Sequence, residues 1–178
     1  MPGVLGIPRA ALGGGVSDRV LVHHAVVSRF DGLVDRCRGQ PEQGGILLGA
    51  YRKEGLEVVG LTEAAPADER ALTRFVRQDP VHQAAATAAW RESGGQLTMI
   101  GEWHTHPFGE PEPSSTDLGT WGAAVRRSRL PLLFVIVAPG RWRAFRGTRR
   151  LMILRLARLG AAVAGEVGLL LFPEGESR

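Results

Sequence analysis

Residues 97–138 read LTMIGEWHTHPFGEPEPSSTDLGTWGAAVRRSRLPLLFVIVA, and this stretch sets the expected fold. Leu97 to Trp103 is mostly apolar and predicts a strand, which leads into a polar segment from His104 to Asp117. Serines 114 and 115 are both suitable N-caps for a helix that runs to about residue 128. Leu132 to Ala138 is apolar and rich in β-branched residues, as in a buried strand. The stretch therefore predicts a strand, a polar loop, a helix and a buried strand in succession.

The rest of the chain continues this mixed pattern on both sides. Gly and Pro clusters separate further apolar segments, and the sequence has no internal repeat. We expect strands at 19–22, 45–51, 56–62 and 141–145, helices at 26–38 and 80–91, and a loop at 63–79 with some extended structure around Phe75. This pattern favours one layered α/β (α+β) domain around a single buried sheet.

The length of 178 residues fits one domain. We expect a flexible leader at 1–17, the domain at 18–172 and a tail at 173–178. The leader lacks a basic start before its hydrophobic residues, so it does not resemble a signal peptide. The apolar segment 151–172 is interrupted by two arginines and a glutamate, so it predicts no membrane span. The sequence leaves three interpretations of segment 151–172 open, namely a helix that packs on the domain, a dimer contact and a tail that docks a partner.

Cys37 is the only cysteine. A single cysteine excludes an intramolecular disulfide framework and a multi-cysteine metal site, and it fits a reducing compartment. It lies on the apolar stripe of the first predicted helix, where we expect a packing role. We therefore expect a cytoplasmic protein with no membrane partner.

The positive charge is concentrated in the C-terminal half. Ten of the 22 Lys and Arg residues lie between Leu118 and Gly165, a stretch without Asp or Glu, whereas the other 12 share the rest of the chain with all 18 acidic residues. Such asymmetry is typical of a surface for an anionic partner, but a solvated face has the same composition. No aromatic-plus-basic RNA motif accompanies the arginines, so we expect no nucleic-acid partner.

The side chains suited to metal binding or catalysis are concentrated around two histidines of the polar segment. If the strand extends through His106, the side chains of His104 and His106 point to the same face, because strand side chains alternate with a period of two. Asp117, on the first turn of the next helix, can return to the same point. Two nitrogens and one oxygen with the fourth position open are the ligands of a catalytic zinc site. By contrast, we assign structural roles to the isolated histidines, which are His23, His24 and His82.

Such a site needs a base and a donor for the oxyanion. Glu42 is the leading candidate for the base, because Gly44 and Gly45 allow its strand to pass close to another element. Glu102 is the alternative, because it precedes His104 by two residues and shares its face. Ser114, three residues before Asp117, can aim its hydroxyl at the oxyanion.

These residues together resemble the JAMM signature of MPN-domain metalloproteases. The signature positions are Glu42 before Gly-Gly-Ile-Leu-Leu-Gly, then His104-x-His106-Pro and, after six further residues, Ser114-x2-Asp117. The resemblance covers about residues 20–147. It implies zinc ligation by the two histidines and the aspartate, general acid/base catalysis by the glutamate, and support of the tetrahedral intermediate by the serine. It also implies an MPN/JAB-type fold, with a mixed curved β-sheet flanked by helices in the cytidine-deaminase-like style.

The resemblance further implies hydrolysis of the peptide or isopeptide bond after the C-terminal glycine of a ubiquitin-like protein or its conjugate. Small bacterial members of this kind resemble antiphage-operon deconjugating proteases, whose partners are the activating and conjugating enzymes of the same operon. Two enzymatic alternatives are the trimming of a sulfur-carrier protein in cysteine or cofactor biosynthesis and a role in phage tail assembly. A non-catalytic MPN module that binds partners is a fourth interpretation, although modules of that kind have lost ligands and this sequence has lost none.

Overall fold

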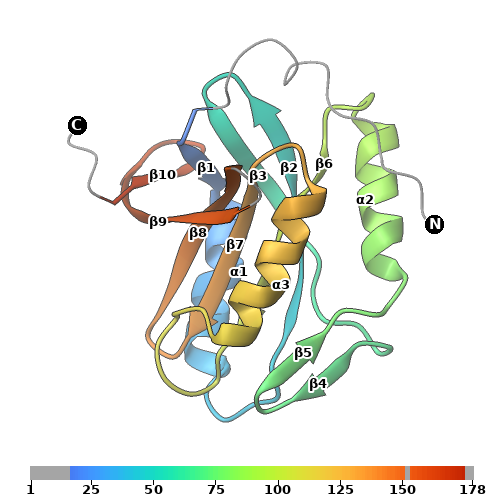
Figure 1. The fold of residues 1–178 in the computed structure, drawn as a ribbon, viewed down its shortest axis with the longest axis vertical. Helices are drawn as coiled ribbons and strands as arrows, with labels where there is room; N and C mark the ends of the chain where they lie inside the picture. The colour runs from blue at the N-terminus through green and yellow to red at the C-terminus, as the bar shows by residue number, and fades with distance from the viewer. Residues whose placement is uncertain (1–16, 151–152, 175–178) are drawn as a thin grey trace.

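The structure is a computed structural model that describes residues 17–150 and 153–174. Most of the expected leader and tail lies outside the described residues. The elements in chain order are β1 (Val20–His23), α1 (His24–Arg36), β2 (Gly44–Arg52), β3 (Gly55–Leu61), β4 (Glu69–Ala71), β5 (Arg74–Val76), α2 (Val81–Glu92), β6 (Thr98–Thr105), α3 (Ser115–Arg127), β7 (Leu132–Ala138), β8 (Arg141–Arg150), β9 (Ile153–Ala164) and β10 (Gly168–Pro173) (Figure 1). The predicted mixture of helices and strands is confirmed.

The main sheet closes on itself, whereas the sequence predicts a curved sheet. Its strands follow the order β1-β10-β9-β8-β7-β6-β2-β3, and β1 also pairs with β3, which completes a barrel. Closure depends on the last strands, because β10 pairs with β1 on one side and with β9 on the other. The segment 151–172 that the sequence analysis left open therefore forms strands where it is described, and the helical alternative is wrong. Glycines 160, 165 and 168 and the alternation of Leu and Arg from 154 to 156 favour that outcome.

The strand β7 divides two hydrophobic clusters. Leu133, Val135 and Val137 face the cluster under α1, whereas Phe134 and Ile136 face the cluster under α3. In Figure 1, α3 lies in front of β7 and β8, and α1 lies behind them. A strand buried on both faces has no polar alternation, which explains the continuous apolar run at 132–138.

The helices carry the expected apolar stripes. In α1, buried residues recur at Val26, Phe30 and Leu33, and Cys37 is buried just after the helix, as expected for a packing residue. In α3, Trp121 stacks on Phe134 with ring centroids 4.4 Å apart. None of the helices in the described ranges is long and apolar enough to cross a membrane.

Residues 63–79, predicted as a loop with some extended structure, contain the small hairpin β4–β5. A buried network fastens both ends of this segment. The His82 side chain, at the start of α2, lies 2.9 Å from Asp68 Oδ2 and 2.6 Å from Thr62 Oγ1, and both ion-pair partners have fully buried side chains. Asp68 Oδ1 accepts hydrogen bonds from the backbone N–H groups of residues 78 and 79. The structural role predicted for His82 is therefore confirmed.

Candidate metal centre

The two histidines come together at the end of β6. His104 is the penultimate residue of this strand, and the backbone N–H of His106 donates to the carbonyl of Val137 at 2.8 Å, which continues the pairing with β7. The alternation of strand side chains then places both imidazoles on the α3 side. Their Nε2 atoms lie 3.0 Å apart. The structure therefore brings together the pair that the sequence analysis placed on one face.

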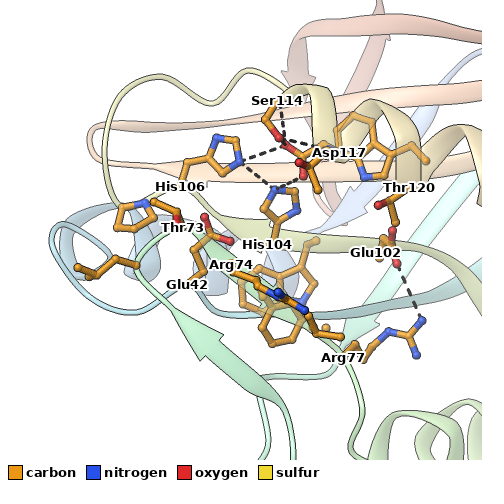
Figure 2. Close-up of a pocket in the computed structure, with 18 of the residues that line it drawn as sticks. Glu42, Thr73, Arg74, Arg77, Glu102, His104, His106, Ser114, Asp117 and Thr120 are labelled. Carbon is orange, nitrogen blue, oxygen red and sulfur yellow. Dashed lines mark hydrogen bonds and ion pairs between the residues drawn. The ribbon is translucent and has the colours of Figure 1, made fainter.

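Asp117 reaches the same point from the first turn of α3. Its Oδ1 lies 3.2 Å from His104 Nε2, and its Oδ2 lies 3.4 Å from His106 Nε2. The position of the carboxylate is fixed by a capping box, in which Asp117 Oδ2 accepts from the backbone N–H of Ser114 and Ser114 Oγ accepts from the backbone N–H of Asp117. Ser114 is thus the N-cap. Figure 2 shows the three side chains converging on one point.

The spacing of these donor atoms fits a zinc ion. Bonds of about 2.0–2.1 Å to imidazole and carboxylate in tetrahedral geometry separate neighbouring donor atoms by about 3.3 Å. The two Nε2 atoms lie 3.0 Å apart, close to that value, and they lie 3.2 and 3.4 Å from different oxygens of Asp117, Oδ1 and Oδ2. His104, His106 and Asp117 are also the group among the described residues whose ligand atoms all lie within 4.8 Å of one another.

The charges at the centre favour an ionised carboxylate. Burial by itself would raise the pKa of Asp117, but hydrogen bonds from His104, His106 and Ser114 outweigh it and hold that pKa well below its usual range. Burial alone would lower the pKa of His106. The interactions with Asp117 and Glu42, together with a hydrogen bond to the backbone of Glu110, raise it instead.

Glu42 lies beside the centre because of the register between β2 and β6. Gly44 pairs directly with His104, so Glu42, two residues earlier, lies on the same face beyond the end of the pairing. Its backbone N–H donates to Ala71 and its carbonyl accepts from Arg70, so the β4–β5 hairpin holds it in place. Burial raises the pKa of Glu42, and the attraction of the nearby histidines only partly offsets that increase.

The predicted close approach of this strand is confirmed at Gly45. A Cβ atom there would lie 2.0 Å from the carbonyl oxygen of Thr62. At Gly44 a Cβ atom would lie 2.5 Å from the ring of Phe75 in the hairpin and 2.6 Å from the Trp103 carbonyl. Glycine is therefore required at both positions for the hairpin, β6 and the residue after β3 to pack next to Glu42.

Glu102 shares the face of His104 but lies at the other side of the centre. Its nearest described counter-charge is Arg77, at 3.9 Å, and Figure 2 shows it between Arg77 and Thr120, away from Glu42. Burial raises its pKa, and the attraction of Arg77 opposes that increase. The two carboxylates therefore flank the histidines from opposite sides.

An open groove of about 820 Å³ contains all of these groups. The hairpin residues 72–77 line one wall, the first half of α3 lines the other, and β6 with the start of β2 forms the floor (Figure 2). Two large apolar side chains line it while remaining exposed, Leu72 at 49% and Phe108 at 58%.

The contacts that hold the loop between His106 and Ser114 were not predicted from the sequence. Glu112 of this loop contacts Arg143 and Arg158, and Glu110 pairs with Arg141. A signal was present in the sequence, because the arginine-rich stretch without acidic residues begins just after this Glu-Pro-Glu segment. The other two histidines lie outside the groove, where His23 pairs with Glu57 and His24 contacts the carbonyl of Gly165.

Comparison with known proteins identifies similar sequences over most of this chain. The family described as prokaryotic homologs of the JAB domain matches residues 33–148. A Pseudomonas aeruginosa protein (strain BWHPSA011 / Pa011) named CD-NTase/cGAS isopeptidase is 35% identical over 124 residues, which are 67% of this chain and 78% of the relative. A Vibrio cholerae protein (serotype O1, El Tor Inaba N16961) of the same name is 33% identical over 102 residues, which are 57% of this chain and 65% of the relative.

A solved structure resembles the fold at lower identity. The solution structure of protein DSY2949 from Desulfitobacterium hafniense has a TM-score of 0.54 and 17% identity, and the match covers 77% of this chain and 88% of that one. The family match runs from the end of α1 into β8 and includes every residue of the candidate metal centre. The chain belongs to the family of prokaryotic homologs of the JAB domain.

Proposed function

We propose that this protein is a zinc-dependent isopeptidase that hydrolyses the bond after the C-terminal glycine of a ubiquitin-like protein, within an antiphage conjugation system. The observation that carries the proposal is the convergence of His104, His106 and Asp117, whose ligand atoms lie close enough together to hold a metal ion, beside Glu42 in an open groove. The names of the relatives support the choice of bond and substrate, because they are CD-NTase/cGAS isopeptidases. We propose a conjugate of an enzyme of that class as the substrate.

Three protein ligands would leave the fourth position of a catalytic zinc site open for water. Bound zinc supplies an electrophile that lowers the pKa of water and polarises a carbonyl. The chain supplies the proton transfers. Glu42 takes the proton of the attacking water as the oxygen bonds to the carbonyl carbon, and it then gives a proton to the departing amine as the carbon–nitrogen bond breaks. A buried carboxylate with a raised pKa suits both steps near neutral pH.

Ser114 is proposed to stabilise the oxyanion. In the described state its hydroxyl donates to Asp117 Oδ2 at 2.6 Å. The hydroxyl has a single proton, so it must rotate from this carboxylate towards the substrate oxygen to play that role. Its position at the edge of the groove allows such a rotation, because Ser114 lines the cavity and is exposed.

The groove determines which substrates fit. Its lining by the hairpin favours an extended tail of small residues such as Gly-Gly. The exposed Leu72 and Phe108, which line the groove, offer apolar contacts to the substrate. The single cysteine is a buried free thiol, which supports a cytoplasmic location for this reaction.

A cleavage assay tests the proposal. The substrate is a ubiquitin-like protein joined through its terminal glycine to a lysine side chain, with a linear fusion in parallel. We expect cleavage after the glycine with zinc, no cleavage after chelation, and recovery on adding zinc back. Zinc bound without cleavage of either substrate would point instead to a partner-binding module. Cleavage of only a free sulfur-carrier fusion would favour the trimming alternative.

A further inference from the structure

The loop from Pro107 to Pro113 links two parts of the candidate metal centre. His106 lies at its beginning, and the N-cap Ser114 with its partner Asp117 lies directly after its end. The conformation of the loop therefore constrains how His106 and Asp117 can meet.

Two arginines from neighbouring strands grip this loop at Glu112. Arg143 of β8 donates to Glu112 Oε1 at 2.7 Å, and Arg158 of β9 contacts both carboxylate oxygens at 2.6 and 2.7 Å. The two arginines are neighbours on one face of the sheet, because Arg158 pairs in register with Phe145. Arg143 is only 23% exposed. A single exposed ion pair contributes little, but a shared network with this geometry holds its members in place.

The ion pairs of Glu112 with the two arginines connect the metal centre to a part of the chain beyond the family match. Residues 33–148 match the family, whereas Arg158 lies in β9. The carbonyl of Arg158 also accepts from the backbone N–H of Glu174, so this arginine sits within the paired C-terminal strands. Part of the arginine-rich stretch thereby gains a function that does not need an anionic partner.

We propose that Glu112 is a positioning residue that, through Arg143 and Arg158, fixes the loop orienting His106 and Asp117 for zinc. The inference rests on the proposed zinc site. It assigns a role to the C-terminal strands, namely that they hold the loop from Pro107 to Pro113 in place through contacts with Glu112. Glu112 touches neither the substrate nor the metal in this role.

The test measures zinc affinity directly, by competition of the purified full chain with a chromogenic chelator. The variants are Glu112→Gln and Arg158→Gln, which remove the charge while keeping similar size. Arg155→Gln is the matched control, because Arg155 lies on the same strand, is exposed and faces the opposite side. Thermal unfolding of the metal-free proteins separates a loss of fold from a loss of positioning.

We expect both test variants to bind zinc about tenfold more weakly, within the range typical of residues that orient metal ligands. Their kcat should fall at limiting zinc and recover at saturating zinc, with KM unchanged, whereas Arg155→Gln should match the wild type in every measurement. Arg158→Lys should lie between, because a lysine keeps the charge but lacks the planar guanidinium and its further N–H donors. Zinc affinity of both variants within twofold of the wild type would overturn the proposal. A wild-type protein that binds no zinc would instead overturn the proposed function.

If Glu112→Gln fails to fold, Arg143→Gln and Arg158→Gln carry the test. High salt provides an independent measurement on the wild type. Screening of the exposed parts of the network should weaken zinc binding towards the level of the variants. It should have no such effect on Arg158→Gln, and an equal salt effect on both proteins would count against the proposal.

Discussion

The hydroxyl of Ser114 donates to Asp117 Oδ2 across 2.6 Å, so one carboxylate both caps α3 and faces the two imidazoles. The chain thereby couples the stability of a helix to the placement of a metal ligand. Replacing Ser114 by Ala should remove the cap and cost about 1 kcal/mol of unfolding free energy. If the hydroxyl also supports the oxyanion, kcat should fall by about 100-fold or more.

Chemical denaturation and steady-state kinetics measure the two effects separately. Ser114→Thr serves as the control, because threonine keeps both the capping oxygen and the hydroxyl proton. A variant Ser114→Ala with unchanged kcat would restrict this residue to capping.

The buried pair of Asp68 and His82 predicts a pH effect on stability away from the metal. Hydrogen bonds from backbone N–H groups and from His82 overcome burial and hold the pKa of Asp68 below its usual range. A carboxyl whose pKa is lower in the folded state stabilises the fold fully above the unfolded pKa of about 3.9, and this stabilisation is lost as the pH falls through the folded value. The wild type should therefore lose stability below about pH 4, and Asp68→Asn should flatten that part of the profile.

Urea unfolding between pH 3 and 7 measures this slope. Asp68→Ala should in addition cost about 3 to 5 kcal/mol at neutral pH, because it leaves buried partners without their acceptor. Asp79→Asn is a suitable comparison, since Asp79 is only partly buried and its carboxylate accepts from the backbone N–H groups of Ala67 and Val81 near the start of α2. Parallel pH profiles for the wild type and Asp68→Asn would contradict the assignment.

The elements that the sequence predicted well are those with strong local signals. Apolar runs predict the strands around Gly45 and Leu132, and a capping residue predicts the helix after Ser114. The alternation of strand side chains predicts that the two histidines share one face. Asp117 could be placed near the histidines because a capping residue three positions after Ser114 must point back to the helix start.

The features that sequence reasoning could not place depend on contacts between distant segments. Barrel closure by β1 and β10 joins residues about 150 positions apart, and no local pattern encodes that register. The same is true of the grip of Arg143 and Arg158 on Glu112, because either arginine is equally compatible with an exposed strand face. The β4–β5 hairpin is only three residues per strand, too short for an alternating pattern to stand out.

Metal binding should stabilise the protein in proportion to the logarithm of the free zinc concentration once that concentration exceeds the Kd. A ligand that binds only the folded state adds about 2.7 kcal/mol at a concentration 100 times its Kd. We therefore expect the melting temperature to rise with zinc and to fall after chelation. His104→Ala should remove this dependence, because it deletes one of the three ligands. His24→Ala is the control, since His24 lies outside the groove.

Glycine at position 45 is predicted to be essential for packing rather than for flexibility. A Cβ atom there would lie 2.0 Å from the Thr62 carbonyl oxygen, so Gly45→Ala must push β2 away from its neighbour next to Glu42. We expect a loss of at least about 1 kcal/mol, as for other overpacked positions. Gly119→Ala on α3 should instead stabilise the helix by up to about 1 kcal/mol, because a Cβ atom at this position would meet nothing within 4 Å and alanine favours helix. Denaturant midpoints of the two variants should therefore move in opposite directions.

The choice between Glu42 and Glu102 as the base follows from their different surroundings. Glu42 interacts most strongly with His104 and His106, whereas the leading counter-charge of Glu102 is Arg77. Burial raises the pKa of both carboxyl groups, so their positions decide between them, and the ion pair with Arg77 holds Glu102 on the other side of the centre from Glu42. Glu42→Gln should therefore lower kcat by about 100- to 10,000-fold while zinc affinity and the melting temperature stay near wild type. Glu102→Gln should keep most of kcat.

The residual activity of Glu42→Gln should also lose the acidic limb of the kcat/KM profile against pH, since that limb reports ionisation of the base. If Glu102→Gln showed the larger loss of kcat and Glu42→Gln kept the acidic limb, the roles of the two carboxylates would have to be exchanged.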